Sequence, residues 1–349
     1  MTYNKKYSLK AAADMPGVAF SAIKAVSLYE AQEHDLSILI NSENKLVVDT
    51  IYGAYEFVEL EVGTLVTIHS DSENSIFVLK DALVQNLDHF APGSTGTIKW
   101  SDQQEYGQLP PNFQFTTIEF IERISERFIR LRLSVPDLSE YTDQSIHFRL
   151  VLPKHNVGEV KWPTVRENGS VGWPTGNGEL HKPVYTARSV NLENGTLDLD
   201  IFLHNGGQVT EWAKSLNEGQ QVAIIGPGGG GVPDTDKIQI FVDETAYPAA
   251  ARILETLNDN TIGSLTLLTE KGFVGDYDFS VPCGVSVSWI ERKDQHIFSE
   301  LTLNTIENLK DAFFWFAGEK DDAMKVRKRA IEMNIAKEKR YIGSYWSRG

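Results

Sequence analysis

The most conspicuous candidate for chemistry is a run of five glycines and one proline at residues 226–231. Glycine-rich loops can hold phosphates with their backbone N–H groups, but a Walker loop also needs a Lys-Ser/Thr pair, and a dinucleotide fingerprint needs a helix directly after the loop. Here Val232 and Pro233 follow, and the next residues have the pattern of a strand. The sequence therefore favours a flexible turn between two strands over a phosphate site.

A second candidate is the segment KPVYTAR at residues 182–188. The hydroxyl of Thr186 can donate a hydrogen bond to a phosphate or to a ring nitrogen. Side chains alternate between the two faces of a strand, and Tyr185 and Arg188 are three positions apart. They therefore share one face only if a β-bulge lies between them. The alternative is a core tyrosine beside a solvated arginine, and the spacing alone favours that alternative.

A third candidate is the turn after the predicted strand TLDLDIFLH. His204, Asn205 and Gly206 lie in this turn, and Thr210 stands near the start of a helix predicted over residues 209–216. The N–H groups at a helix terminus suit a pyrophosphate. A capped helix also forms without any ligand, so both interpretations stay open.

Carboxylates follow two predicted buried strands. Asp243, Glu244 and Thr245 come directly after the strand KIQIFV, and Gly318 and Glu319 end the strand FFWFAGE. In an open α/β sheet, ligands bind outside the carboxyl ends of the strands, which makes both positions candidates for a nucleotide site. Equally, these carboxylates could serve only to stabilise helix N-termini.

Hydrophobic periodicity divides the chain into three predicted domains. Short alternating runs and one helical pattern predict a small α+β domain at residues 1–105, which ends in a polar, proline-containing linker at residues 101–114. Six or seven strand-like runs predict an antiparallel β-barrel at residues 112–235, and alternating strands and helices predict an open α/β domain at residues 236–349. Helices are expected near residues 76–90, 209–216, 245–257 and 303–310, and from residue 322 onward.

Composition excludes several functional classes. The chain has 349 residues and a formal net charge of −15, which argues against nucleic acid or a membrane surface as its main partner. Its single cysteine, Cys283, allows no intrachain disulfide, and no HExxH, GxSxG or spaced histidine motif predicts a metal site or hydrolytic chemistry. Cysteine usage and the lack of a long apolar run favour the cytoplasm. An activity would therefore rest on a bound organic cofactor.

Taken in order, seven segments resemble the siderophore-interacting protein family, a flavin-dependent ferric-reductase branch related to ferredoxin reductases. The resemblance runs from about residue 115 to the last residue. The first hundred or so residues are similar to a small domain of unknown role that is fused upstream in some members. The segments are VYTAR at 184–188, LDIFLHNGGQVTEWA at 199–213, VAIIGPGGG at 222–230, VDETAYPAAARILE at 242–255, SWIER at 288–292, FWFAGE at 314–319 and YIGSYWSRG at 341–349.

The resemblance implies FAD in the barrel and NADPH or NADH as electron donor, with ferredoxin as an alternative donor. It implies a reductase that delivers electrons to the Fe(III) of a ferric siderophore and releases Fe(II), because hard oxygen ligands hold Fe(III) more tightly. The flavin carries this chemistry, so no catalytic side chain is implied. The implied contacts are Tyr185, Thr186, Arg188, His204, Asn205, Gly206 and Thr210 for FAD, and Asp243, Glu244, Thr245, Gly318 and Glu319 for the nicotinamide nucleotide.

Two positions depart from the family pattern. Pro183 stands where an arginine is usual, with Lys182 beside it, and Val242 stands where a glycine is common. A lysine can neutralise a phosphate but cannot bind it in a bidentate manner. The departures favour one alternative to a siderophore reductase, a non-enzymatic flavin- or siderophore-binding protein. A second alternative is a flavin reductase of the same fold that acts on quinones or free flavin.

A basic C-terminal region is the expected docking surface for an anionic iron chelate. Residues 319–349 carry nine Lys and Arg against five Asp and Glu, a net charge of +4, whereas the rest of the chain carries −19. The helix predicted from residue 322 turns its basic face outward, although this could also be an ordinary solvated face. Tyr345 and Trp346 either stack on a ligand or pack internally. The docking candidates are Arg149, Arg292, Lys325, Lys328 and Arg329.

Overall fold

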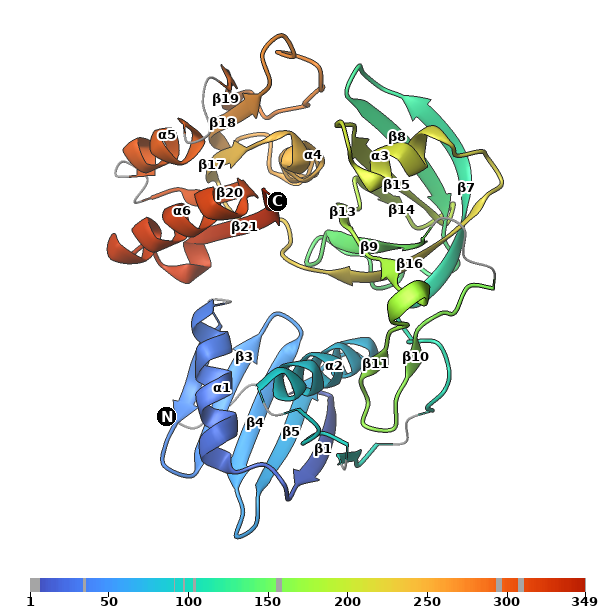
Figure 1. Cartoon of the computed structure of the whole chain (residues 1–349). Helices are drawn as coiled ribbons and strands as arrows, with labels where there is room; N and C mark the ends of the chain where they lie inside the picture. The colour runs from blue at the N-terminus through green and yellow to red at the C-terminus, as the bar shows by residue number, and fades with distance from the viewer. Residues whose placement is uncertain are drawn as a thin grey trace. The chain divides into compact units, whose positions relative to one another are not determined.

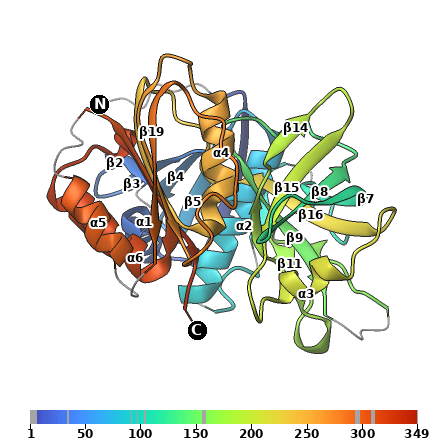
Figure 2. The same ribbon diagram turned by 90° about the horizontal axis from the view of Figure 1, so that it is seen from above.

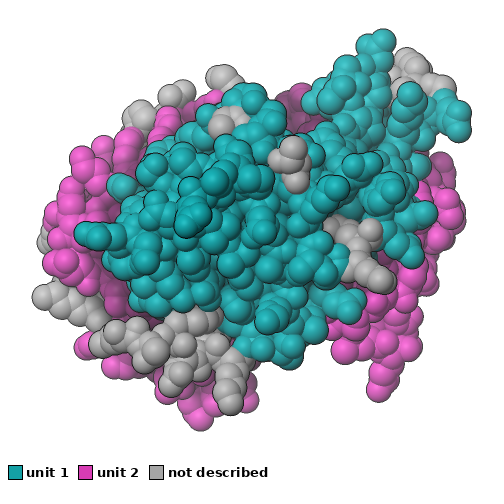
Figure 3. Space-filling model, turned by 90° about the horizontal axis from the view of Figure 1, so that it is seen from below, with its two compact units in different colours: residues 1–113, 153–180 teal, residues 114–152, 181–349 magenta. Residues whose placement is uncertain are grey.

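The computed structural model describes the chain except for residues 1–6, 34–35, 91, 97, 103–104, 155–158, 293–296, 307–310 and 349. Its contacts divide it into two compact units, which Figure 3 colours separately. Unit 1 comprises residues 1–113 and 153–180, and unit 2 comprises residues 114–152 and 181–349. Unit 2 therefore contains the predicted α/β domain and most of the predicted barrel. Residues 153–180 lie within the predicted barrel in sequence but belong to unit 1.

Unit 1 is built on a six-stranded antiparallel sheet in the order β2-β3-β4-β5-β1-β6. Two helices, α1 (Phe20–Glu33) and α2 (Glu73–Phe90), lie on one face of this sheet (Figure 1). Ile76, Leu79, Leu83 and Leu87 of α2 are buried, which confirms the predicted helical spacing. The strands are β1 (Leu9–Met15), β2 (Ser37–Asn41), β3 (Lys45–Thr50), β4 (Gly53–Glu59), β5 (Thr64–Ser70) and β6 (Lys99–Trp100).

The second part of unit 1 is a hairpin that the chain forms after leaving the barrel. Its strands are β10 (Thr164–Val165) and β11 (Val171–Gly172), which pair in antiparallel fashion. A short 3-10 turn, η1 (Gly176–Gly178), follows before the chain returns to the barrel at β12 (Leu180–His181). The predicted barrel is thus interrupted by a segment that packs with the N-terminal sheet and helices.

The barrel of unit 2 follows the strand order β12-β9-β16-β7-β8-β15-β14, with β13 paired to β9. β13 and β14 follow each other closely in the chain, yet β14 pairs with β15, far from β9 in this order. The connection between β13 and β14 therefore closes the sheet into the predicted antiparallel barrel. The remaining elements are β7 (Phe113–Arg123), β8 (Phe128–Ser134), β9 (His147–Pro153), β13 (Val184–Thr186), β14 (Ser189–Asn191), β15 (Thr196–Phe202), α3 (Gln208–Lys214) and β16 (Gln221–Gly228).

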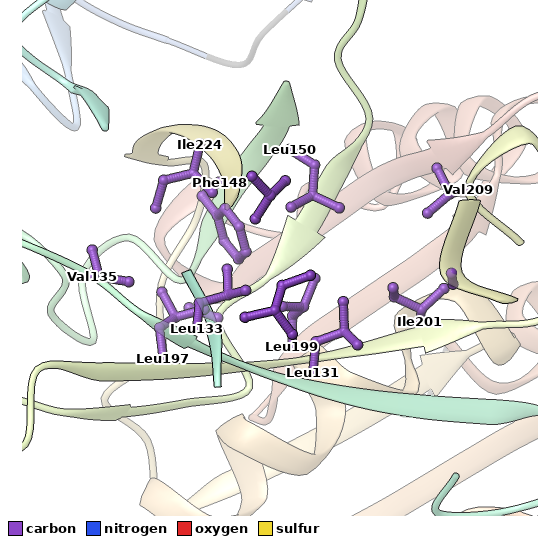
Figure 4. Close-up of a cluster of buried hydrophobic side chains, with 14 of the residues drawn as sticks. Leu131, Leu133, Val135, Phe148, Leu150, Leu197, Leu199, Ile201, Val209 and Ile224 are labelled. Carbon is purple, nitrogen blue, oxygen red and sulfur yellow. The ribbon is translucent and has the colours of Figure 1, made fainter. Parts of the chain in front are cut away.

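Apolar side chains from facing strands fill the barrel (Figure 4). Leu131 and Leu133 of β8 and Leu197 and Leu199 of β15 are fully buried. Residues between them, such as Arg132, point to the other face of the sheet, as the strand period of two requires. Tyr185 of β13 and Val209 of α3 pack against this interior, so it supports the elements that carry the candidate residues.

The remainder of unit 2 is a five-stranded parallel sheet in the order β19-β18-β17-β20-β21. Helix α4 covers one face, and α5 and α6 cover the other (Figure 2). In β20, Trp315 packs with the α4 side and Phe314 and Phe316 with the α6 side. The elements are β17 (Lys237–Val242), η2 (Glu244–Ala246), α4 (Tyr247–Thr256), β18 (Ile262–Thr269), β19 (Gly284–Glu291), α5 (Ile297–Ile306), β20 (Phe313–Glu319), α6 (Lys320–Glu332), η3 (Lys337–Lys339) and β21 (Arg340–Trp346).

This arrangement confirms the predicted open α/β domain with a parallel sheet. One helix is displaced relative to the prediction: α5 begins at Ile297 rather than near residue 303. The predicted end of that helix, residues 307–310, lies outside the described residues. Ile297, Phe298 and Leu301 have the three-to-four spacing of a helix, so the sequence does carry a signal for the earlier start of α5.

Candidate functional site

The carboxylate cluster lies where the order of the parallel strands reverses. β17 and β20 are neighbours in the sheet, with Val242 opposite Ala317. The chain runs outward from β17 to β19 and then crosses to β20, so the carboxyl ends of β17 and β20 form the topological switch point at which open α/β sheets bind ligands. The structure therefore brings Asp243 and Gly318 together, as the sequence analysis expects.

Asp243 is buried at this edge and accepts three hydrogen bonds. Its Oδ1 accepts from the backbone N–H and the hydroxyl of Thr245, at 3.1 and 2.6 Å. Its Oδ2 accepts from the indole N–H of Trp346 at 2.7 Å. Burial raises the pKa of Asp243 despite these donors. A side chain at Gly318 would bring a Cβ within 3.0 Å of this Oδ2, so glycine permits the close approach of β20.

Glu244 is also buried and pairs with an arginine from the end of β19. Its Oε1 accepts from the backbone N–H of Glu270 at 2.8 Å, and its Oε2 accepts from Arg292 at 2.6 Å. Burial raises the pKa of Glu244 to about 7, although the Arg292 charge opposes the shift. Arg292 thus lies at the carboxyl-end edge of the sheet, and its Nε is buried without a hydrogen-bond partner among the described residues.

Glu244→Gln is expected to flatten the pH dependence of stability between about pH 4.5 and 7. Because its pKa is raised on folding, Glu244 binds more protons in the folded than in the unfolded chain, so its contribution favours folding at low pH and is lost as pH rises through this window. The wild type should lose about 2–3 kcal/mol more than the variant across the window.

The measurement is urea unfolding of both proteins at several pH values. Glutamine keeps the oxygen that accepts from Glu270, so the comparison isolates the titration. Glu218→Gln, at an exposed position, is the matched control and should follow the wild type. Parallel pH profiles for wild type and Glu244→Gln would contradict the assignment.

Glu319 serves as the N-cap of α6. Its Oε2 accepts from the backbone N–H of Asp321 and Asp322, at 2.7 and 3.4 Å, and its Oε1 accepts from the backbone N–H of Arg348 at 3.2 Å. Burial alone raises the pKa of Glu319, but these amide donors together lower it below its usual value. Glu319 therefore caps a helix, which the sequence allowed as the alternative to a nucleotide contact. Asp243 caps η2 in the same way.

On the barrel, Tyr185 and Thr186 lie on β13, opposite Phe148 and His147 of β9. Tyr185 is half-buried and packs against the barrel core, and burial raises its pKa. Thr186 is buried, with its hydroxyl 3.4 Å from Nδ1 of His147. A core tyrosine is therefore what the structure shows at position 185.

His147 is a residue of this site that the sequence analysis missed. Its Nε2 lies 3.0 Å from the hydroxyl of Tyr345, and the two rings meet edge to face. Burial, together with the nearby charge of Arg252, lowers the pKa of His147 to about 4. The imidazole is neutral at pH 7 and joins Thr186 on the barrel to Tyr345 on the C-terminal strand. Strand pairing between β9 and β13 is the only signal that could have indicated it.

The glycine run packs tightly against these same residues. A Cβ at Gly229 would lie 2.7 Å from the His147 ring, and one at Gly230 would lie 2.5 Å from the ring of Tyr341. The loop leads from β16 into the α/β sheet at β17, as the turn interpretation expects, but its glycines are required by close packing rather than by flexibility.

Arg188 does not lie free beside the other predicted cofactor residues. Its Nη1 and Nη2 donate to the two oxygens of Glu255 on α4, at 2.6 and 2.5 Å, and its Nε donates to the Tyr277 hydroxyl at 3.3 Å. This buried guanidinium, which lies between β13 and β14, donates to both the Glu255 carboxylate and the Tyr277 hydroxyl. It joins the barrel to α4 of the α/β domain, so the alternative of a solvated arginine is wrong, and the cofactor contact stays a prediction.

The turn before α3 is formed as predicted. Thr210 is buried, and its hydroxyl accepts from the backbone N–H of His204 at 3.1 Å. The side chains of His204 and Asn205 are exposed, and Gly206 has φ +77°. A Cβ at Gly207 would approach the His204 ring to 2.7 Å. The structure thus gathers the predicted residues into one turn with outward-facing polar groups.

Two family models cover the part of the chain that contains these sites. The siderophore-interacting FAD-binding domain matches residues 117–231, and the siderophore-interacting protein model matches residues 235–349. The chain belongs to the siderophore-interacting protein family. The matches coincide with the two predicted domains that carry the turn before α3 and the carboxyl ends of β17 and β20.

Relatives of this siderophore-interacting protein include two proteins named as reductases. Ferric vibriobactin reductase ViuB of Vibrio cholerae is 28% identical over 252 residues, which cover 66% of this chain and 89% of that protein. The NADPH-dependent ferric-chelate reductase of Escherichia coli is 28% identical over 241 residues, which cover 67% and 92%.

Solved structures support the fold of the same region. A siderophore utilization protein from T. fusca has a TM-score of 0.60 and 23% identity, covering 71% of this chain and 97% of that chain. The siderophore-interacting protein SipS from Aeromonas hydrophila has a TM-score of 0.56 and 22% identity, covering 68% and 99%. At these identities the likeness establishes the fold alone.

The structure places the predicted docking residues on α6, on β9 and directly after β19. Lys325 and Lys328 are exposed on α6, and Arg329 pairs with Glu332 at 3.6 Å. Arg149 on β9 donates to the carbonyl of Lys182 at 2.9 Å, and Arg292 pairs with Glu244 as described above. The outward basic face of α6 is confirmed, because Ala323, Val326 and Ala330 are buried beneath it.

Two kinds of feature are absent from the part of the chain that the structure describes. It has no helix long and apolar enough to cross a membrane. Nor does it contain a group of three or more His, Cys, Asp or Glu side chains that could hold a metal ion.

Proposed function

We propose that this protein is a cytoplasmic, FAD-dependent reductase that uses NADPH or NADH to reduce ferric siderophores and release Fe(II). The observation that carries the proposal is the match of two family models to residues 117–231 and 235–349, most of which form unit 2, where a barrel turn suited to a pyrophosphate and a nucleotide-type sheet edge both occur. The names of the two reductase relatives support the same activity.

FAD fits the residues of the barrel. The Thr210 hydroxyl uses an oxygen lone pair to accept from His204, which leaves its own proton for a phosphate oxygen. The exposed turn at His204, Asn205 and Gly206 offers backbone and side-chain groups to the ribose and pyrophosphate. Tyr185 and Thr186 would border the isoalloxazine. Arg188 would lie close to the cofactor, where Glu255 holds its guanidinium.

The nicotinamide nucleotide would bind at the carboxyl ends of β17 and β20. Trp346 holds the Asp243 carboxylate, and Arg292 holds the Glu244 carboxylate, so both acidic groups are fixed before any ligand arrives. Gly318 keeps this edge open to a close approach. Thr245 and Glu319 shape the edge through their capping hydrogen bonds.

Bound FAD supplies the redox chemistry, since it accepts a hydride from the nicotinamide and returns single electrons. One NADPH therefore suffices for two Fe(III) ions. Exposed Lys325 and Lys328 of α6 supply positive charge for an anionic ferric siderophore. NADPH is the preferred candidate for donor because one relative is named NADPH-dependent; ferredoxin remains the alternative donor.

The test is turnover by the purified full chain with NADPH and FAD. With a ferric catecholate or hydroxamate siderophore, Fe(II) should accumulate as its ferrozine complex at close to twice the rate of NADPH oxidation. The same enzyme is then assayed with a soluble quinone and with free flavin. Rapid quinone or flavin reduction without Fe(II) release would favour the flavin-reductase alternative and contradict the proposal.

A further inference from the structure

A histidine and a threonine lie side by side on one face of the barrel sheet in unit 2. His147 is directly opposite Thr186 in the pairing of β9 with β13. The next backbone hydrogen bond runs from the N–H of Ala187 to the carbonyl of Ile146 at 2.8 Å. His147 and Thr186 are therefore a non-hydrogen-bonded pair, the arrangement that brings opposite side chains closest together. Nδ1 of His147 accordingly lies 3.4 Å from the Thr186 hydroxyl.

Both side chains face away from the interior of the barrel. Their strand neighbours Phe148 and Tyr185 pack with the barrel core. Since side chains alternate along a strand, His147 and Thr186 point to the opposite side. Both are nevertheless buried, so another part of unit 2 covers them.

The C-terminal strand β21 and the glycine run cover the imidazole. The Tyr345 hydroxyl lies 3.0 Å from Nε2 of His147, and the two rings meet edge to face with centroids 5.5 Å apart. A Cβ at Gly229 would lie 2.7 Å from the same imidazole, so the glycine backbone packs directly against it. Burial raises the pKa of the Tyr345 phenol well above its usual range, so this hydroxyl keeps its proton at neutral pH. Each ring nitrogen of His147 thus faces one hydroxyl.

Arg252 of α4 acts on both ends of this group. Its Nη1 donates to the carbonyl of Ala187, the residue after Thr186, at 2.5 Å, and its Nη2 donates to Asp143 at 3.0 Å. Burial and, to a smaller extent, the charge of Arg252 lower the pKa of His147 to about 4. At neutral pH the imidazole therefore has one nitrogen that donates and one that accepts.

The backbone of Tyr185 indicates which nitrogen donates. A hydrogen bond between this backbone and the imidazole raises the pKa of His147, which is the effect of a ring N–H that donates to a carbonyl. Tyr185 lies on β13, and Nε2 already faces Tyr345 on β21. The nitrogen on the β13 side is Nδ1, so Nδ1 carries the proton and Nε2 accepts from the Tyr345 hydroxyl.

This tautomer determines what the Thr186 hydroxyl can do. An Nδ1–H group has no lone pair to take the Thr186 proton, so Thr186 can only accept from His147 and keeps its own proton for another partner. Tyr345 can donate to Nε2 and still accept from the Tyr341 side chain, to which it is also hydrogen-bonded. With the opposite tautomer, Nδ1 would accept the Thr186 proton and no donor would remain.

We propose that His147 and Tyr345 are positioning residues for the flavin site, because together they keep the Thr186 hydroxyl available as a hydrogen-bond donor to the flavin ring. This inference rests on the proposed function, in which Thr186 borders the isoalloxazine. A donor at a nitrogen or carbonyl oxygen of the ring stabilises the negative charge that the ring gains when it accepts a hydride. Strand pairing and burial fix this donor before FAD binds.

The first test determines the tautomer of His147 in the purified full chain without added cofactor. Nitrogen-15 NMR of histidine-labelled protein distinguishes Nδ1–H from Nε2–H rings, and comparison with His147→Asn identifies the His147 signals. We expect the Nδ1–H form at pH 7 and a larger share of the Nε2–H form in Tyr345→Phe, which lacks the donor to Nε2. An Nε2–H ring in the wild type, or an unchanged tautomer in Tyr345→Phe, would overturn the proposal and leave the proposed function intact.

The second test asks whether Tyr345 acts through Thr186. It measures the first-order rate at which saturating NADPH bleaches bound FAD in a stopped-flow instrument. Thr186→Val removes the donor and should slow the bleaching about 10- to 100-fold. Tyr345→Phe keeps the ring and should slow the bleaching about 3- to 10-fold. In a variant that already carries Thr186→Val, adding Tyr345→Phe should change the rate no further, because the two residues act as one unit.

His89→Asn, at an exposed histidine of α2, is the matched control and should bleach at the wild-type rate. Multiplying rate losses in the double variant would overturn the proposal alone, since Tyr345 would then act independently of Thr186. The tautomer of the wild-type ring provides the test even if a variant fails to fold. A wild-type chain that binds no FAD would overturn both this proposal and the proposed function.

Discussion

Asp200→Ala is expected to lower the free energy of unfolding by about 3–5 kcal/mol. Asp200, on β15, is almost completely buried. It accepts from Nε and Nη2 of Arg130 at 2.7 and 2.8 Å, and from the hydroxyl of Tyr277 at 2.5 Å. Arg188 lies 3.8 Å away. Alanine would leave two guanidinium groups and a phenol without this carboxylate, and buried charges that lose a partner are costly.

The adjacent pair on the same two strands provides a matched control. Asp198 accepts two hydrogen bonds from Arg132 in the same bidentate geometry, at 2.7 and 2.9 Å, but the Arg132 side chain is 45% exposed. Water can solvate Arg132 after Asp198→Ala, so this substitution should cost about 1 kcal/mol. Urea unfolding of the full chain measures both variants. Equal losses would contradict the view that the Asp200 network contributes more than a partly exposed ion pair.

Thr210→Val is expected to weaken FAD binding about 10- to 100-fold, which corresponds to a lost hydrogen bond to a charged phosphate. Valine preserves the shape of the buried side chain but has no hydroxyl. The substitution also removes the acceptor of the His204 N–H, so the turn before α3 loses its internal hydrogen bond. Titration of the full chain with FAD, followed by flavin fluorescence, gives the dissociation constant.

Thr210→Ser tests whether the hydroxyl itself, and not the fold of the turn, determines the affinity for FAD. Serine keeps the oxygen that accepts from His204 and the proton proposed to reach the phosphate, so its FAD affinity should stay within a few-fold of the wild type. If valine and serine bind FAD equally well, the Thr210 hydroxyl does not contact the cofactor, and the proposed pyrophosphate site at this turn would have to be abandoned.

Much of the fold is predictable from local pattern. The strands β3 to β5 and helix α2 follow clear alternation or three-to-four spacing, and the structure confirms them. β1 is missed because LKAAADM contains no β-branched residue, and α1 is missed because its buried face rests on few large residues, such as Phe20 and Ile23. The inserted hairpin is also missed, since its partners lie far away in the sequence.

The candidate site is predictable only in part, for a similar reason. Turn and strand-end residues such as Thr210 and Asp243 are identified by their place beside a regular element. His147, Tyr277 and Arg252 have no local signal, because their roles come from partners remote in the sequence: Tyr345 for His147, Asp200 for Tyr277, and Asp143 with the carbonyl of Ala187 for Arg252. The pairing of Arg188 with Glu255 is likewise not predictable, since nothing near Arg188 in the chain indicates Glu255.

The visible absorption spectrum of the purified full chain tests the central claim most directly. The account predicts the bands of oxidised flavin, either as purified or after addition of FAD and removal of the excess. Anaerobic NADPH should bleach these bands, and a ferric siderophore should restore them while Fe(II) forms. A colourless protein that retains no added FAD, or a bound flavin that NADPH reduces but a ferric siderophore does not reoxidise, would contradict the account.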